Sequence, residues 1–255
     1  MNMFNWELFI FLILACIPGI WLILPVSKNI YKIIKSDKSK NKKIPSENLF
    51  LFVSVLQSLM LVTLAAFIGT KVLHSTHFSI SICNFTKYII PITTINLGGI
   101  VIFLFSYYFL FRPNLDLKTI RSMEQLRLDT GIFGRIFYGG IVEEVIFRWG
   151  LMSFISWIGI SLFGYSNTVI WISILLSGLC FAIGHLPAYL AFGCIKSNTF
   201  ITMVIVLNIW AATIFGWLFW HYGLYAAIFS HALFHLTWYP IDLAVNCGKG
   251  KLLYD

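Results

Sequence analysis

The sequence predicts an all-α polytopic membrane protein, a bundle of about seven transmembrane helices, with eight as the alternative, whose N-terminus lies outside and whose C-terminus is cytoplasmic. The first observation is composition: 59% of the 255 residues are apolar, 11% are charged, and the mean hydropathy is +0.85. These values are typical of polytopic membrane proteins and leave no long polar region for a separate soluble domain. The other two observations are the length of the apolar runs and the one-sided distribution of basic residues.

The apolar runs give the expected helices in chain order. Seven runs approach the ~20 residues that cross the hydrocarbon core as a helix, and they cover about 8–26, 49–70, 88–111, 136–154, 168–191, 200–220 and 224–245. The segment 112–135 mixes charges with spaced apolar residues, which indicates an amphipathic surface helix that leads into the fourth span. The charge-free stretch 157–167 is expected to form an external turn, with an eighth helix near 157–165 as the alternative.

The basic residues set the expected orientation. Fifteen of the 18 Lys and Arg residues fall on one side of this layout, with seven after the first run, five in 112–135, one at Lys196 and two near the C-terminus. This asymmetry predicts that these connections are cytoplasmic. It also accounts for the net charge of +8 without a nucleic-acid partner, because the basic residues are not interleaved with aromatic residues and match no nucleic-acid motif. Five cysteines without a CxxC pair indicate neither a disulfide framework nor a zinc knot.

One polar interruption lies in the fourth run. Glu143, Glu144 and Arg148 fall within six positions of a stretch that otherwise has the composition of a membrane span. A charged side chain at the centre of a span costs roughly 2.5–3.5 kcal/mol on insertion scales, so such residues indicate function and need partners. On a helix, Glu144 and Arg148 stand at i,i+4 and can pair, while Glu143 points about 100° away from Glu144. Glu143 must therefore find its partners on other helices.

Three histidines in later spans are the candidate partners. His185 lies toward the end of the fifth run, and His231 and His235 stand at i,i+4 in the seventh. Each must be satisfied inside the bundle, so a shared polar cavity is expected. Counted from the predicted ends at ~1.5 Å per residue, however, Glu143 and His185 lie near the cytoplasmic edge and His231 lies nearer the external edge. The motifs can meet only if these boundaries shift or the last helix is tilted or broken.

Such a cavity suits hydrolysis. A glutamate can take a proton from water, and histidines can donate to the oxyanion that develops on a scissile carbonyl. The same side chains could instead hold a divalent metal such as zinc, because His231 and His235 have a spacing that metal ligands use, although an HExxH motif is absent. The residues leave both chemistries open. No cofactor is certain, and a glutamate-activated water without a committed metal is preferred.

Three short motifs occur in a set order over about 139–235. Glu143 to Arg148 matches EExxxR, a second match, FxxxH, ends at His185, and His231 to His235 occupies the position of HxxxN/D. In this order and separation they resemble the CPBP intramembrane proteases, the family that includes the Rce1-type CAAX prenyl proteases and the bacterial Abi proteins.

The resemblance implies a role for each motif residue in an intramembrane peptidase. Glu143 would activate water, Glu144 and Arg148 would orient and support the site, and His185 and His231 would position water or bind the oxyanion. His235 stands where the family usually has Asn or Asp, which slightly raises the metal alternative, since an imidazole is also a metal ligand. On this interpretation 1–255 is one integral membrane domain, in which 1–122 carries no recognised motif and 123–246 is the protease-like core.

The expected partners are the lipid bilayer and a membrane-embedded or lipidated peptide substrate. A bias toward Lys, Asn, Ile and Phe favours a bacterial cell membrane, and with it peptide maturation or bacteriocin self-immunity over prenyl processing. Two other classes stay open: a proton-coupled transporter that uses Glu143, Glu144 and His185 as a relay, and a non-catalytic membrane scaffold. No second set of interrupted spans, which would indicate the inverted repeats of a transporter, is found in the sequence.

Overall fold

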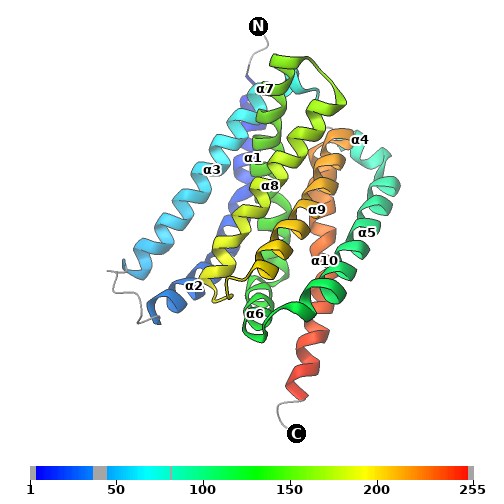
Figure 1. The fold of residues 1–255 in the computed structure, drawn as a ribbon. Coiled ribbons are helices and arrows are strands. Elements are labelled where there is room, and N and C mark those ends of the chain that lie inside the picture. The colour runs from blue at the N-terminus through cyan, green and yellow to red at the C-terminus, as the bar shows by residue number, and fades with distance from the viewer. Residues whose placement is uncertain (1–3, 37–44, 81, 252–255) are drawn as a thin grey trace.

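Long apolar helices make up nearly all of the computed structural model, which describes residues 4–36, 45–80 and 82–251 (Figure 1). No strand occurs in these ranges, so the all-α prediction is confirmed. The α-helices in chain order are α1 (Trp6–Leu22), α2 (Leu24–Ser36), α3 (Glu47–Thr76), α4 (Ile82–Lys87), α5 (Ile89–Phe105), α6 (Leu117–Gly134), α7 (Ser153–Phe163), α8 (Asn167–Ala191), α9 (Asn198–Tyr222) and α10 (Leu224–Lys251).

Four segments of other helical geometry join these helices. They are η1 (Ser106–Phe111), η2 (Arg112–Asn114), η3 (Arg135–Glu143) and η4 (Val145–Met152). Three of them, η1, η3 and η4, have the wide turns of a π-helix, a rare geometry found frequently at functional sites. Gly131, with φ of 61°, breaks α6 just before η3 and turns the chain into the fourth predicted span.

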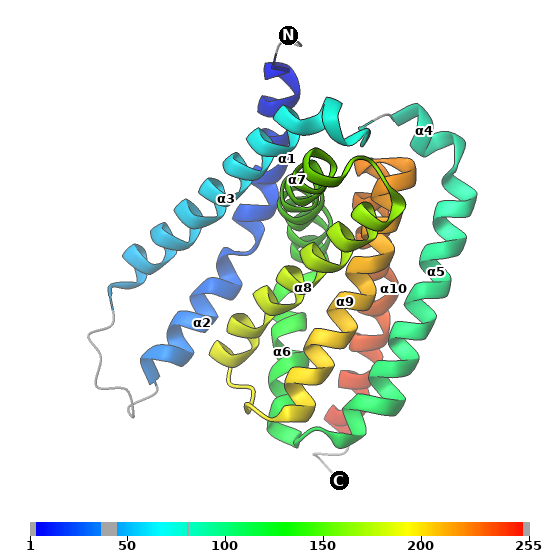
Figure 2. The ribbon, with the colours of Figure 1, turned by 45° about the horizontal axis from the view of Figure 1, so that its top comes forward.

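Five helical stretches of the described chain are long and apolar enough to cross a membrane. They are Glu47–Thr76, Ile89–Asn114, Leu117–Phe163, Asn167–Ala191 and Asn198–Tyr222, and α1 and α2, bent by 45°, make a sixth if they count as one span. The predicted seventh span, α10, is not among them. It nevertheless runs alongside α9 for most of the bundle (Figure 2). A polytopic helix bundle is therefore confirmed, while the number of crossings and their orientation stay predictions.

Two segments expected to lack helical structure are helical. Residues 28–36, assigned to a lysine-rich loop, continue as α2, because Val26, Ile30 and Ile33 pack against Leu126 and Phe192 while the lysines stay outside. The rest of that loop, 37–44, lies outside the described residues.

The prediction of an external turn at 157–167 was wrong for most of these residues. Helix α7 continues the fourth span as far as Phe163, and the chain turns only over 164–166. Gly164, with φ of 77°, ends α7, and the Ser166 side chain caps the first turn of α8.

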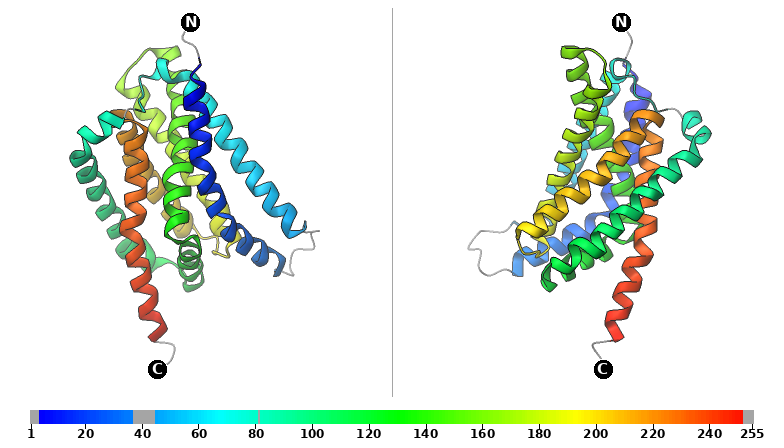
Figure 3. Two further views of the ribbon diagram at one scale, coloured as in Figure 1. Left: turned by 180° about the vertical axis from the view of Figure 1, so that it is seen from behind. Right: turned by 45° about the vertical axis from the view of Figure 1, so that its right-hand side comes forward.

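The ends of the helices fall in two groups. The N-terminal end of α1 and the α7–α8 turn lie at one end of the bundle, and the C-terminal end of α10 lies at the other (Figures 1 and 3). The end of α2, the start of α3, the start of α6 and the α8–α9 connection share the end at which α10 finishes. The prediction from the basic residues requires the same grouping, with the connections rich in Lys and Arg together at one end of the bundle.

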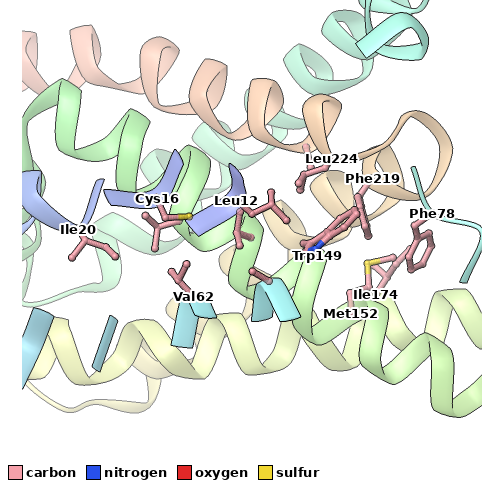
Figure 4. Packing of buried hydrophobic residues seen from close by; sticks show 14 of the residues in the cluster. Leu12, Cys16, Ile20, Val62, Phe78, Trp149, Met152, Ile174, Phe219 and Leu224 are labelled. Carbon is pink, nitrogen blue, oxygen red and sulfur yellow. The ribbon is translucent and has the colours of Figure 1, made fainter. Parts of the chain in front are cut away.

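The core at the N-terminal end of the bundle is built around Trp149 (Figure 4). Trp149 is completely buried and packs with residues of α1, α3, α8 and α9. The segment that carries Trp149 comes very close to α3. The closeness is evident at two glycines, since a Cβ on Gly69 would collide with the Trp149 backbone and a Cβ on Gly150 would collide with Ala65. Small residues thus let the two backbones approach, the usual arrangement at helix contacts in membranes.

We expect Trp149→Ala to destabilise the protein by ~3–5 kcal/mol, the cost of an unfilled cavity left by a large buried aromatic side chain. Thermal unfolding in one detergent measures the effect. Trp157→Ala is the matched control, since Trp157 is 39% exposed on the next helix and should change the unfolding midpoint little. Equal midpoints for the two variants would contradict this description of the core.

Candidate active site

Four of the six motif residues meet at one partly open cavity of about 670 Å³. Its walls come from α1, α2, α3, α5, α6, α8, α9 and α10 and from the segments η1, η3 and η4. Glu143, His185, His231 and His235 all line it, whereas Glu144 and Arg148 lie behind its wall. Helices far apart in the sequence are thus brought together around the first glutamate.

Glu144 is the buried centre of this arrangement, with no exposed side-chain surface. One of its oxygens, Oε1, lies 3.2 Å from Arg148 Nη1 and 2.7 Å from His231 Nδ1. The pair with Arg148 is the i,i+4 contact that the sequence predicts, and the contact with His231 ties the fourth span to α10. Because a carboxylate only accepts hydrogen bonds, His231 Nδ1 carries the proton and donates it.

Aromatic rings enclose the Arg148 guanidinium. It lies 4.6 Å from the ring centre of Phe181 and 5.4 Å from that of Phe215, distances at which a cation is attracted to the face of a ring. Phe215 also stacks on His231, with ring centres 4.6 Å apart, and Phe181 lies edge-on to His185. The two phenylalanines therefore hold the ion pair and both histidines in place.

Glu143 faces the cavity, as the 100° offset from Glu144 predicts. Its side chain is 17% exposed, and its two oxygens lie 4.0 Å from His185 Nε2 and 3.9 Å from His231 Nε2. These gaps are too long for direct hydrogen bonds and suit one bridging water. The geometry therefore places one carboxylate oxygen opposite each imidazole nitrogen, with room for a bridging water in either gap.

The hydrogen bonds made by Nδ1 of His185 and His231 determine whether the Nε2 atoms that face Glu143 carry a proton. His185 Nδ1 lies 2.8 Å from the carbonyl oxygen of Phe181, and since a carbonyl only accepts, this Nδ1 donates. A neutral His185 then presents an unprotonated Nε2 to the cavity, able to accept a hydrogen bond from water. His231 has the same tautomer when neutral, and when doubly protonated it presents an Nε2–H beside Glu143, with the Glu144 carboxylate compensating the charge.

His235 lies one turn beyond His231 and stacks on it, with ring centres 4.9 Å apart. Its buried Nδ1 has no hydrogen-bond partner among the described residues. The described residues also include no group of three or more His, Cys, Asp or Glu side chains arranged to hold a metal ion.

Unequal helix ends explain how His231 reaches Glu143. The α7–α8 turn extends well beyond the α9–α10 turn along the bundle (Figures 1 and 3). The predicted depths assumed that all the helices start at one common membrane edge. Helix α10 instead begins deeper in the bundle, so its second turn lies level with Glu143.

Sequence reasoning missed a second charged cluster at the cavity. Arg127 and Arg135, counted as cytoplasmic surface charges, are buried, and both contact the buried Asp242 of α10. The available signal was Asp242 itself, a carboxylate inside the last apolar run. Asn208 of α9 also lines the cavity and was not singled out.

Comparison with known families gives one match. Residues 130–237 match the model described as Type II CAAX prenyl endopeptidase Rce1-like. Comparisons with curated proteins and with solved structures found no match. The matched segment contains every motif residue of the predicted site and confirms the resemblance to the CPBP/CAAX proteases. Residues 130–237 of this integral membrane protein are therefore similar to the CAAX-type intramembrane endopeptidases.

Proposed function

We propose that the protein hydrolyses a peptide bond of a membrane-associated or lipidated peptide by a water that Glu143 activates. The observation that carries the proposal is the position of the Glu143 carboxylate, about 4 Å from the Nε2 atoms of both His185 and His231 in one cavity. A general base must lie within reach of the proton that it removes, directly or through one water, and this position satisfies that requirement.

The hydrolysis proceeds in two stages. The water between Glu143 and His185 attacks the scissile carbonyl carbon as its proton passes to the Glu143 carboxylate. Protonated His231 donates from Nε2 to the oxyanion that forms, and Glu144 and Arg148 hold His231 in orientation. Glu143 then delivers the proton to the departing nitrogen, the C–N bond breaks, and a carboxylic acid and an amine form; proton exchange between these products leaves a carboxylate and an ammonium group.

The cavity wall supports a lipidated substrate. Apolar residues of α1, α2 and α9, among them Ile20, Ile30 and Leu207, line the same space as Glu143. The family name refers to prenylated CAAX substrates, and a prenyl or acyl chain suits such a wall. In a bacterial cell membrane, the role we propose is maturation of a membrane-associated peptide or self-immunity to a bacteriocin.

The general base is tested by Glu143→Gln and Glu143→Ala in purified protein given a library of quenched membrane peptides. We expect both to lower kcat/KM by ~10²–10⁴-fold, the usual contribution of a positioned general base. Glu7→Gln is the matched control, since Glu7 is in the first turn of α1 and outside the cavity.

Two outcomes would contradict the assignment. Cleavage that survives both Glu143 substitutions would remove Glu143 from the mechanism. If the wild type cleaves no peptide and Glu143-dependent proton flux is measured in liposomes, the protein is a proton-coupled transporter instead.

Metal dependence is tested on the same sample. With water activated by Glu143 alone, we expect the rate to be unchanged after incubation with a chelator, and we expect zinc to be below one atom per chain. If the chelator abolishes activity and added zinc restores it, the Glu and His side chains of the site bind a metal.

Gly139 is expected to matter for activity and not for folding. A Cβ at this position would lie 2.7 Å from His235 Nε2 and 3.4 Å from His231 Nε2, so Gly139→Ala must push the α10 histidines out of place. The displaced atoms are the ends of side chains, which can move without unfolding the bundle. We expect at least about a tenfold loss of kcat/KM with a nearly unchanged unfolding midpoint. Gly98→Ala is the control, because a Cβ there meets no atom within 4 Å.

A further inference from the structure

Helix α2 has a basic face and an apolar face on opposite sides. At about 100° per residue, its three lysines fall within an arc of about 60°. All three are exposed; they are Lys28, Lys32 and Lys35. A second arc of about 60° on the other side of the helix is apolar. Its residues, which are buried or partly buried, are Val26, Ile30 and Ile33. Helices with this division of charged and apolar residues lie in the membrane interface.

The apolar face of α2 forms part of the cavity wall. Val26 and Ile30 line the same cavity as Glu143. Beside them, Asn29 donates a hydrogen bond of 3.0 Å to Asp129 of α6. The axis of α2 is bent by 45° from that of α1, so α2 is not held in place as a straight continuation of α1. The position of this part of the wall therefore depends on the side-chain contacts of α2.

The basic face of α2 carries more positive charge than its neighbours neutralise. Lys28 Nζ lies 2.8 Å from an oxygen of Glu47, at the start of α3. Within α2 and the first turn of α3, three lysines thus face one carboxylate, which leaves a net charge of +2. This surface is accessible, because the Lys28 and Glu47 side chains are 49% and 35% exposed.

The surface beside the lysines suits a lipid better than a soluble acidic protein. The first two turns of α3 expose Leu49, Phe52 and Val53, and the Tyr31 hydroxyl ties α2 to the start of this helix by donating to the Pro45 carbonyl oxygen. The end of α2 and the start of α3 also lie at the end of the bundle that carries the basic connections (Figure 3). A phospholipid can place its headgroup at the lysines and its acyl chains along the apolar side chains, whereas a soluble acidic protein would use the lysines alone.

We propose that Lys28, Lys32 and Lys35 bind the headgroups of anionic phospholipids and that this contact holds the opposite face of α2 in the cavity wall. Basic side chains next to a membrane span are attracted to an anionic leaflet, and the excess charge of this face supplies that attraction. The lipid contact stands by itself. Its effect on the cavity rests on the proposed peptidase function, because peptide cleavage is how that effect is measured.

Lipid binding is tested on purified protein in a neutral detergent, with an equal mixture of phosphatidylglycerol and phosphatidylcholine that have the same acyl chains. Native mass spectrometry measures the ratio of the two bound lipids. We expect the wild type to prefer phosphatidylglycerol, and the double variant Lys32→Gln/Lys35→Gln to lower this preference by at least about fivefold, the contribution of one lysine near an anionic surface. Lys32→Arg/Lys35→Arg keeps the charge and should keep the preference.

The matched control is the double variant Lys71→Gln/Lys87→Gln. It removes the same amount of charge from two exposed lysines near the ends of α3 and α4, at the opposite end of the bundle from α2 (Figure 1). We expect it to keep the preference for phosphatidylglycerol.

The effect on the cavity is tested in nanodiscs of phosphatidylcholine, with and without phosphatidylglycerol, using the library peptide that the wild type cleaves fastest. We expect phosphatidylglycerol to raise wild-type kcat/KM by about fivefold, the lower end of the usual coupling between two sites. In Lys32→Gln/Lys35→Gln we expect the two rates to be nearly equal. Each ratio is measured on one enzyme preparation, so a partial loss of folded protein cancels.

The two measurements separate the possible failures. Equal binding of both lipids by the wild type, or the same loss of preference in the control variant, would overturn the lipid site on α2. A preference for phosphatidylglycerol with equal cleavage in both nanodiscs would overturn the effect on the cavity and leave the peptidase function intact. Absence of cleavage in both nanodiscs would overturn the peptidase function and with it the effect on the cavity, while the ratio of bound lipids would still decide the lipid site.

Discussion

The structure depends on the burial of the Glu144 carboxylate. A charge without solvent is tolerated only where donors surround it, and here those donors are Arg148 on the same helix and His231 on α10. The charge of Glu144 is satisfied only if α10 packs against the fourth span at the position where His231 reaches Glu144. The same contact orients the ring of His231 and turns its second nitrogen toward Glu143.

Close backbone packing makes this contact possible. Gly139 leaves room for the histidines of α10, and the wide turns of η3 place Arg135, Gly139 and Glu143 along the cavity. Aromatic residues then complete the enclosure, since Phe181 and Phe215 cover the guanidinium of Arg148 and contact the histidines. The Glu144–Arg148 pair is thus held in an apolar shell that excludes bulk water and strengthens the electrostatic contact between them.

The cavity has two polar centres of opposite character. At the first centre, the Glu143 carboxylate lies about 4 Å from the Nε2 atoms of His185 and His231. Near Arg135, two guanidinium groups share one buried carboxylate. Between and beside them the walls are largely apolar. Such a space matches a peptide that enters with an apolar anchor.

The sequence by itself determined the helical membrane class, the order of the apolar spans and the motif residues. These follow from local properties: apolar runs of spanning length, charge asymmetry, and the i,i+4 spacing of Glu144 and Arg148. It did not determine the helix ends, since the limits of α7 and the depth at which α10 begins depend on packing between helices. Nor did it show that Arg127 and Arg135 are buried, because a basic residue near a span has the same local pattern whether it faces water or Asp242. Only the tertiary structure decided which charges share a cavity, because their partners lie about a hundred residues away in the chain.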